Sequence, residues 1–168
     1  SHLLIVITGP GHGESGDPGG RFGLRQCAQA AGEVLDALGV VEPVDWVGNA
    51  WGGHVGLRFA AAYPLRMRSL VTLGAPVVAL STYEQARMRL LFVVHTLLGP
   101  TGMVTSPLVE TMLSAATRSN DPEAVALFRE SFVEQHPVRL RNAVVSVSLR
   151  REDLTALLPG INVPTLMI

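Results

Sequence analysis

The sequence predicts an α/β protein in which a parallel, doubly wound sheet carries an inserted block of helices. Strand-like and helix-like segments alternate over the first 75 residues, and this order requires parallel crossovers. The pattern changes to helices alone after residue 80, and a last strand-like segment follows. We therefore expect a sheet core formed by residues 1–80 and 151–168. Residues 81–150 should form a helical cap over the carboxyl edge of the sheet, where ligands bind in such folds.

The elements of the core are predicted from apolar runs bounded by turn residues. The expected strands are residues 2–8 (HLLIVIT), 44–48 (VDWVG), 69–74 (SLVTLG) and 162–168 (NVPTLMI). A helix is expected over residues 22–39, where apolar residues share one face and Gly39 ends the pattern. A second helix is expected over residues 54–64, ended by Pro64.

The helical block contains several amphipathic stretches. They are residues 81–98, 107–118, 120–135, 137–149 and 151–158. Pro122 follows a capping residue, which favours a helix start there. The longest apolar run, residues 90–98, is shorter than the roughly 20 residues that a membrane-spanning helix needs.

Composition limits the classes of partner. A net charge of −1 over 168 residues gives no electrostatic attraction for nucleic acid or an acidic membrane, so neither is expected as a partner. The single cysteine, Cys27, lies on an apolar helix face and is expected in the core. Histidines and carboxylates are too scattered for a metal site. Because no signal-peptide pattern is present, we expect a cytoplasmic protein.

The glycine-rich segment GPGHGESG matches a dinucleotide fingerprint at Gly11, Gly13 and Gly16. That fingerprint works only if a helix begins at the glycines and directs its N-terminus at the pyrophosphate. The following DPGGR prevents a helix until about residue 22. A Rossmann-type dinucleotide site therefore remains a disfavoured alternative.

The segment GNAWGGH (48–54) predicts a tight strand-to-helix turn with Ala50 at its apex. A turn of this kind holds its apex residue at positive φ and needs small neighbours two positions away, which Gly48 and Gly52 provide. Gly53 would let the following helix approach the sheet. A residue other than glycine costs about 1–3 kcal/mol at positive φ, so Ala50 is interpreted as a shortened serine or aspartate.

The residues beside the apex complete the expected site. The backbone N–H of Trp51 would supply half of an oxyanion hole. Asn49 precedes the apex. We expect the methyl group of Ala50 to point toward the floor of a covered cavity.

Three stretches together resemble the α/β-hydrolase superfamily. GPGHGESG is similar to the loop after that family's fourth strand, and INVPTLMI to its seventh strand. PVDWVGNAWGGHVGLRFAAAYPLRMRSLVTLGAPV is similar to the family's fifth strand, elbow, helix and sixth strand. The resemblance implies a nucleophile at the elbow and an acid after the sixth or seventh strand. It further implies a histidine after the eighth strand and no cofactor.

The chain departs from that pattern at each catalytic position. The apex is Ala50, and no carboxylate follows SLVTLG directly. We expect a core truncated at both ends, without strands one to three, the acid or the catalytic histidine. Of the histidines present, His12 and His54 are expected to be structural, and His2, His95 and His136 do not follow the family's chain order. The chain as written is therefore expected to be inactive and, through an unpaired apolar strand at residues 2–8, to self-associate.

The identity of the missing nucleophile stays open. Asn49 resembles the GNSxGG of serine-dependent esterases and carbon–carbon bond hydrolases, whereas Trp51 resembles the DWGG of epoxide hydrolases and haloalkane dehalogenases. We favour serine. The leading hypothesis is a hydrolase for a small, mostly apolar, ester-like substrate. The alternative is a non-catalytic member that keeps the pocket as a binding module.

Overall fold

The computed structural model describes residues 3–16, 18–99, 102–133 and 137–168, and it divides into two compact units. The first unit comprises Ser1–Leu80 and Asn142–Ile168, and the second comprises Ser81–Arg141. The sequence pattern placed the end of the helical block at residue 150. The second segment of the first unit already starts at Asn142, because Ala143, Leu149 and Leu154 are buried in that unit.

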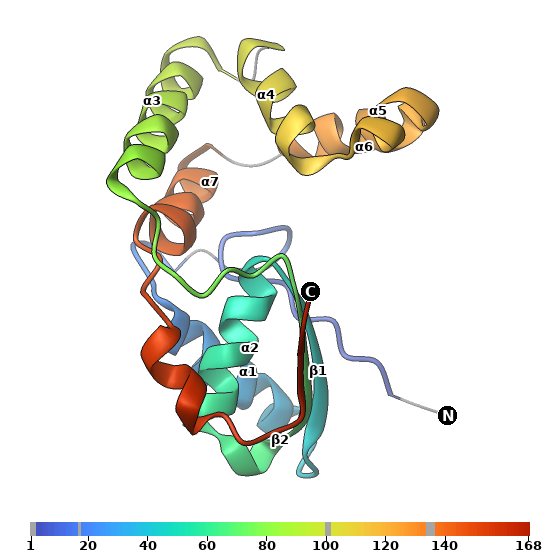
Figure 1. Cartoon of the computed structure of the whole chain (residues 1–168), viewed down its shortest axis with the longest axis vertical. Coiled ribbons are helices and arrows are strands. Elements are labelled where there is room, and N and C mark those ends of the chain that lie inside the picture. The colour runs from blue at the N-terminus through green and yellow to red at the C-terminus, as the bar shows by residue number, and fades with distance from the viewer. Residues whose placement is uncertain (1–2, 17, 100–101, 134–136) are drawn as a thin grey trace. The chain divides into compact units, whose positions relative to one another are not determined.

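A parallel sheet forms the centre of the first unit. Its strands are β1 (Val44–Asn49), β2 (Met67–Leu73) and β3 (Thr165–Met167), in the order β1-β2-β3 (Figure 1). Both pairs are parallel, with Val47 opposite Val71 and Val71 opposite Leu166. The central strand is the most deeply buried, since Leu70 is fully buried there.

Two helices cover one face of this sheet. α1 (Leu24–Ala37) packs against α2 (Trp51–Ala62), and α2 contacts both β1 and β2 (Figure 1). Shorter helical turns complete the unit: η1 (Pro64–Arg66), η2 (Val145–Leu149) and η3 (Thr155–Gly160). α2 lies between α1 and the sheet, which explains why Leu57, Phe59 and Ala60 are almost completely buried.

The strand expected over residues 2–8 is the main error of the sequence prediction. Residues 3–8 form no strand, and Leu3, Leu4 and Val6 are 80%, 84% and 81% exposed. A strand requires a hydrogen-bonded neighbour. Within the described parts of the chain, the sheet on the β1 side ends at β1, and residues 3–8 form no hydrogen-bonded ladder with it.

The second unit is entirely helical in the residues that the structure covers. Its helices are α3 (Thr82–Leu98), α4 (Gly102–Met112), α5 (Ala115–Asn120), α6 (Pro122–Val133) and α7 (Pro137–Val144), which continues into the first unit. The helix expected over residues 107–118 is divided, because the Ser114 hydroxyl accepts the N–H of Thr117 and starts α5.

The other expected helices of this region also differ at their ends. The segment expected as one helix over 137–149 changes from α7 into the π-helical turn η2. The segment expected over 151–158 forms the 3₁₀ turn η3 instead. Among the described helices, none combines the length and the apolar character that crossing a membrane requires.

Candidate active site

The turn between β1 and α2 has the sharp geometry that the glycine spacing predicts. Ala50 has φ 45° and ψ −111°, and it alone among the described non-glycine residues has positive φ. Its ψ lies outside the left-handed helical region, where ψ is about +30° to +60°. The backbone at Ala50 therefore has the expected positive φ but not a left-handed helical conformation. The Ala50 N–H donates to the carbonyl of Leu73 on the neighbouring strand at 2.7 Å, which fixes the apex to β2.

The glycines around the apex differ in how strictly they are needed. A Cβ at Gly48 would overlap the backbone carbonyl of Gly52, so no other residue fits there. A Cβ at Gly53 would lie 2.6 Å from Cβ of Ala75, which confirms the close approach of helix to sheet. Gly52 is less constrained by its surroundings. Apart from its chain neighbours and the backbone of α2 itself, a Cβ at this position would meet nothing within 4 Å.

The N–H of Trp51 is a free donor beside the apex. Trp51 is the first residue of α2, and the first N–H groups of a helix have no partner inside it. Within the described chain, no backbone carbonyl accepts this N–H. The positive end of the helix dipole coincides with the same position. An anionic oxygen placed above Ala50 would thus meet one donor and a favourable potential.

Trp46 stabilises the elbow, a role that the sequence analysis missed. Its indole Nε1 donates to the carbonyl of Gly52 at 3.0 Å, and its ring stacks on Phe59 with centroids 5.4 Å apart. This contact fixes the first turn of α2 to β1. An aromatic residue two positions before Gly48 was the available signal.

The side chain of Trp51 connects the elbow to the glycine-rich loop. Its ring centroid lies 5.4 Å from that of His12 and 5.8 Å from that of Phe22. A Cβ at Gly9 would overlap the Trp51 ring, so glycine is needed there for close packing. The His12 Nδ1 is 3.1 Å from the Pro10 carbonyl, in agreement with a structural role for this histidine.

The loop geometry does not match the dinucleotide alternative. Gly11 and Gly13 adopt positive φ within a series of tight turns, and α1 begins only at Leu24. A pyrophosphate at Gly11–Gly16 would therefore meet no helix N-terminus.

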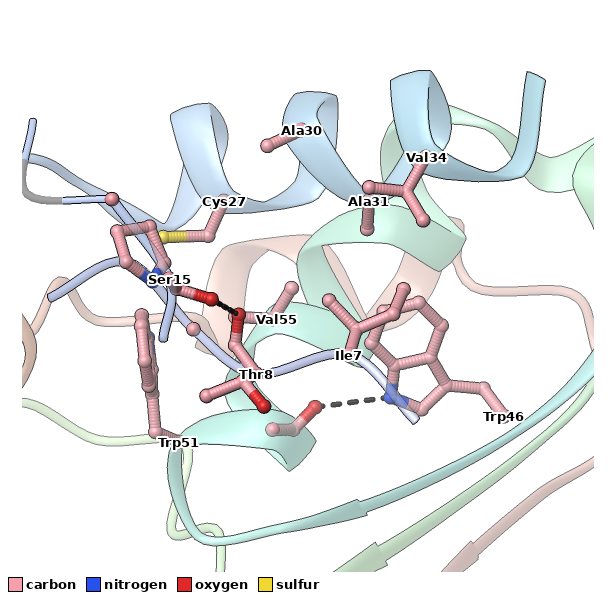
Figure 2. A pocket seen from close by; sticks show the side chains of 14 residues that line it. Ile7, Thr8, Ser15, Cys27, Ala30, Ala31, Val34, Trp46, Trp51 and Val55 are labelled. Atoms are coloured by element: carbon pink, nitrogen blue, oxygen red, sulfur yellow. Dashed lines mark hydrogen bonds between the residues drawn. The ribbon is translucent and has the colours of Figure 1, made fainter. Parts of the chain in front are cut away.

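A cavity of about 250 Å³ lies between the glycine-rich loop, α1 and the start of α2 (Figure 2). Its lining is mostly apolar, with Trp46 and Trp51 toward opposite ends and Cys27 on the α1 side. Burial raises the pKa of the Cys27 thiol to about 11, so the thiol stays protonated and unreactive near neutral pH. Ala50 is exposed and is absent from the lining of this cavity. The reason is that the cavity adjoins the α1 side of the elbow rather than its apex.

His54 follows the elbow but is occupied by a structural contact. The side chain is only 4% exposed, and Nε2 lies 2.9 Å from the carbonyl of Pro76. Burial lowers the pKa of this imidazole, and the positive charge of Arg151 lowers it further. The neutral ring therefore donates from Nε2 to Pro76, which confirms the structural role expected for His54.

This burial predicts a specific pH dependence of stability. The unfolded chain binds a proton at His54 near pH 6.5, whereas the folded chain resists it, so stability should be complete above pH 6.5 and decrease as the pH falls. His54→Gln should lower the free energy of unfolding at pH 8 by about 1–3 kcal/mol. The same variant should lose less stability than the parent between pH 7 and 5. Urea unfolding at several pH values measures both effects, and parallel pH curves for the two proteins would refute the assignment.

The remaining histidines of the sequence prediction lie outside the elbow and the glycine-rich loop. His95 lies on α3 in the second unit, with its ring 6.5 Å from that of Phe92. His2 and His136 lie outside the described residues. No group of three or more His, Cys, Asp or Glu side chains among the described residues is arranged to hold a metal ion.

Comparison with known proteins agrees with this fold. A family model described as the alpha/beta hydrolase fold matches residues 4–135. The chain is 27% identical over 142 residues to a 2-hydroxy-6-oxo-2,4-heptadienoate hydrolase of Pseudomonas putida, covering 79% of this chain and 49% of the relative. It is 29% identical over 147 residues to a 2-hydroxymuconate semialdehyde hydrolase of Pseudomonas putida, covering 82% and 50%.

A solved structure shows the same arrangement. The thermophilic esterase from Thermogutta terrifontis matches with a TM-score of 0.83 and 24% identity, covering 95% of this chain and 58% of the esterase. The chain belongs to the α/β-hydrolase family. It spans about half the length of the curated relatives that it matches.

Proposed function

We propose that this chain carries the site of an esterase-like hydrolase for a small, mostly apolar substrate, and that with Ala50 it binds such a substrate without turning it over. The observation that carries this proposal is the strained apex. Ala50 adopts φ 45°, which costs about 1–3 kcal/mol and which glycine would adopt without that cost. Backbone strain of this kind is typical of functional sites, where a side chain is held in position for a substrate. Alanine presents only a methyl group.

The chemistry that the elbow suits is nucleophilic attack on a carbonyl carbon. A serine at position 50 would attack from the apex, and the developing oxyanion would accept the free N–H of Trp51. Attack also needs a base that removes the hydroxyl proton. His54 is unsuited to this role because its Nε2 is bound to the Pro76 carbonyl. Binding without turnover is the consistent expectation for the chain as it stands.

The relatives support a hydrolytic parent. Two are named as hydrolases of a 2-hydroxy-6-oxo dienoate and of a muconate semialdehyde, so carbon–carbon bond hydrolysis lies within the class of reactions proposed. The aspartate-type alternative, with an epoxide or a haloalkane as substrate, has no comparable support among these relatives. A natural non-catalytic binding protein remains the second candidate, favoured by the same alanine. In both cases we propose that the helical block, expected over residues 81–150, serves as a cap.

The test is to restore a nucleophile in the full-length gene product. Ala50→Ser should hydrolyse short p-nitrophenyl esters at least about 100-fold faster than the parent, because a serine served by a general base regains the chemical step. Ala50→Gly is the matched control and should stay inactive, and Ala50→Asp tests epoxides and haloalkanes. Turnover by Ala50→Asp alone would replace the esterase assignment. No turnover by either variant, together with retained ligand binding, would favour the binding-module function.

A further inference from the structure

A second cavity, of about 190 Å³, lies in the first unit and shares no lining residue with the cavity beside the elbow. It is formed where the start of α1, the middle of α2 and the chain after η2 meet. The polar side chains that line it are Arg25, Arg58, Ser146, Arg150, Arg151 and Glu152. This volume is smaller than the roughly 300–1,000 Å³ typical of sites for drug-sized ligands, so a small ligand or a single functional group fits it.

The lining is strongly positive. It contains four arginines and one glutamate, while the whole chain has a net charge of −1. Glu152 is paired with Arg58, with Nη2 3.0 Å from Oε2. Three guanidinium charges therefore remain uncompensated by carboxylates of the lining. Arginine stays protonated at any physiological pH and suits bidentate binding of oxyanions.

One donor on the lining of this cavity has no acceptor in the described chain, the hydroxyl of Ser146. The Arg58 side chain is only 17% exposed, and its unpaired Nε is buried away from the cavity surface. Ser146 is 7% exposed, and its Oγ accepts the N–H of Phe22 at 3.2 Å. Among the described residues, no hydrogen bond uses the Ser146 O–H as a donor. An unsatisfied buried donor costs about 1–3 kcal/mol, and such groups are uncommon in folded proteins unless a ligand or a water satisfies them.

The backbone around the cavity adds to the same potential. α1 begins at Leu24 with no acidic residue in its first turn, so its positive dipole end lies beside the cavity without a carboxylate. The Gln26 side chain accepts the N–H of Gly23 there at 2.7 Å, which leaves the positive potential in place because the amide is neutral. η2 is a π-helical turn, a feature often found at functional sites, and it carries Ser146. The Arg151 Nε donates to the carbonyl of Val78 at 3.0 Å, which fixes one side of the cavity.

We propose that this cavity binds a phosphate group, either as the free ion or as part of a small phosphomonoester. Three uncompensated guanidinium groups match a dianion better than a monoanion, and the Ser146 hydroxyl would donate to one of its oxygens. Nothing in this inference depends on the chemistry proposed for Ala50. The two sites have separate linings, so one proposal can fail while the other holds.

The experiment is calorimetric titration of the full chain with inorganic phosphate at constant ionic strength. Saturable binding is expected, and Arg150→Gln should weaken it about tenfold or more, the effect of losing a charged hydrogen bond. Arg150 is exposed and has no structural partner in the described chain, so this variant should fold normally. Glu152→Gln should tighten binding, because it removes the carboxylate that competes for Arg58.

The matched control is Arg68→Gln, which removes the same charge from β2, outside the cavity. It should leave phosphate affinity within about twofold of the parent value, since Arg68 does not line the cavity and is paired with Asp45. Glycerol 3-phosphate distinguishes the two sources: binding as tight as that of phosphate indicates a monoester, and binding of phosphate alone indicates the free ion. Absence of saturable binding to either probe would overturn the proposal, as would equal losses in Arg150→Gln and Arg68→Gln.

Discussion

Gly48→Ala is expected to destabilise the first unit by about 3 kcal/mol or more, at the upper end of what overpacking costs. The added Cβ would overlap the carbonyl of Gly52 and approach the N of Gly53 to 2.5 Å. These are backbone atoms at the start of α2, and they cannot rotate away as a side-chain end could. Relief would require α2 to move from β1, which would expose Leu57 and Phe59. Urea unfolding followed by tryptophan fluorescence measures the loss.

Gly52→Ala provides the control at a distance of four residues. A Cβ there would meet no atom within 4 Å, and Gly52 lies in the first turn of α2. Alanine is favoured over glycine in a helix by up to about 1 kcal/mol, so the variant should be as stable as the parent or slightly more stable. The opposite pattern, in which Gly52→Ala is the more damaging change, would show that the elbow geometry described above is wrong.

Phe59→Ala is expected to lower the free energy of unfolding by about 3–5 kcal/mol, the usual cost of removing a large aromatic side chain from a core. Phe59 is 0% exposed, and its ring contacts those of Trp46 and Tyr63 at centroid distances of 5.4 and 5.1 Å. The loss would extend to the elbow, because the Trp46 ring that stacks on Phe59 also donates a hydrogen bond to the carbonyl of Gly52.

The fluorescence of folded Phe59→Ala should therefore change as well as its stability, since Trp46 loses the ring on which it stacks. Tyr63→Ala is the comparison, because Tyr63 is 38% exposed and its ring is tilted against that of Phe59. It should cost clearly less than Phe59→Ala and leave the emission of Trp46 nearly unchanged. Equal costs for the two variants would mean that Phe59 does not support the elbow as described.

Much of the fold follows from local sequence patterns. α1, α2, β1 and β2 lie close to their expected positions, because apolar periodicity and the stops at Gly39 and Pro64 act within a few residues. The strand expected over residues 2–8 failed for a different reason. Its residues favour an extended chain, but a strand exists only where another strand accepts its hydrogen bonds.

The features of the candidate active site also differ in whether local sequence could predict them. The positive φ of Ala50 and the need for glycine at 48 follow from sterics between residues two to four positions apart, which the spacing GNAWGG already contains. The freedom at Gly52 was not visible from that spacing, because it depends on the direction in which the first turn of α2 leaves the sheet.

Residue types and short spacings were enough to predict the α/β class, the elbow and the absence of a nucleophilic side chain at its apex. Which partners meet across long separations could be learned only from the folded chain. It placed His54 against Pro76 and Arg58 against Glu152, and it grouped four arginines around one cavity. Contacts between residues 22 or 94 positions apart depend on how helices pack on the sheet, and no local pattern contains that information.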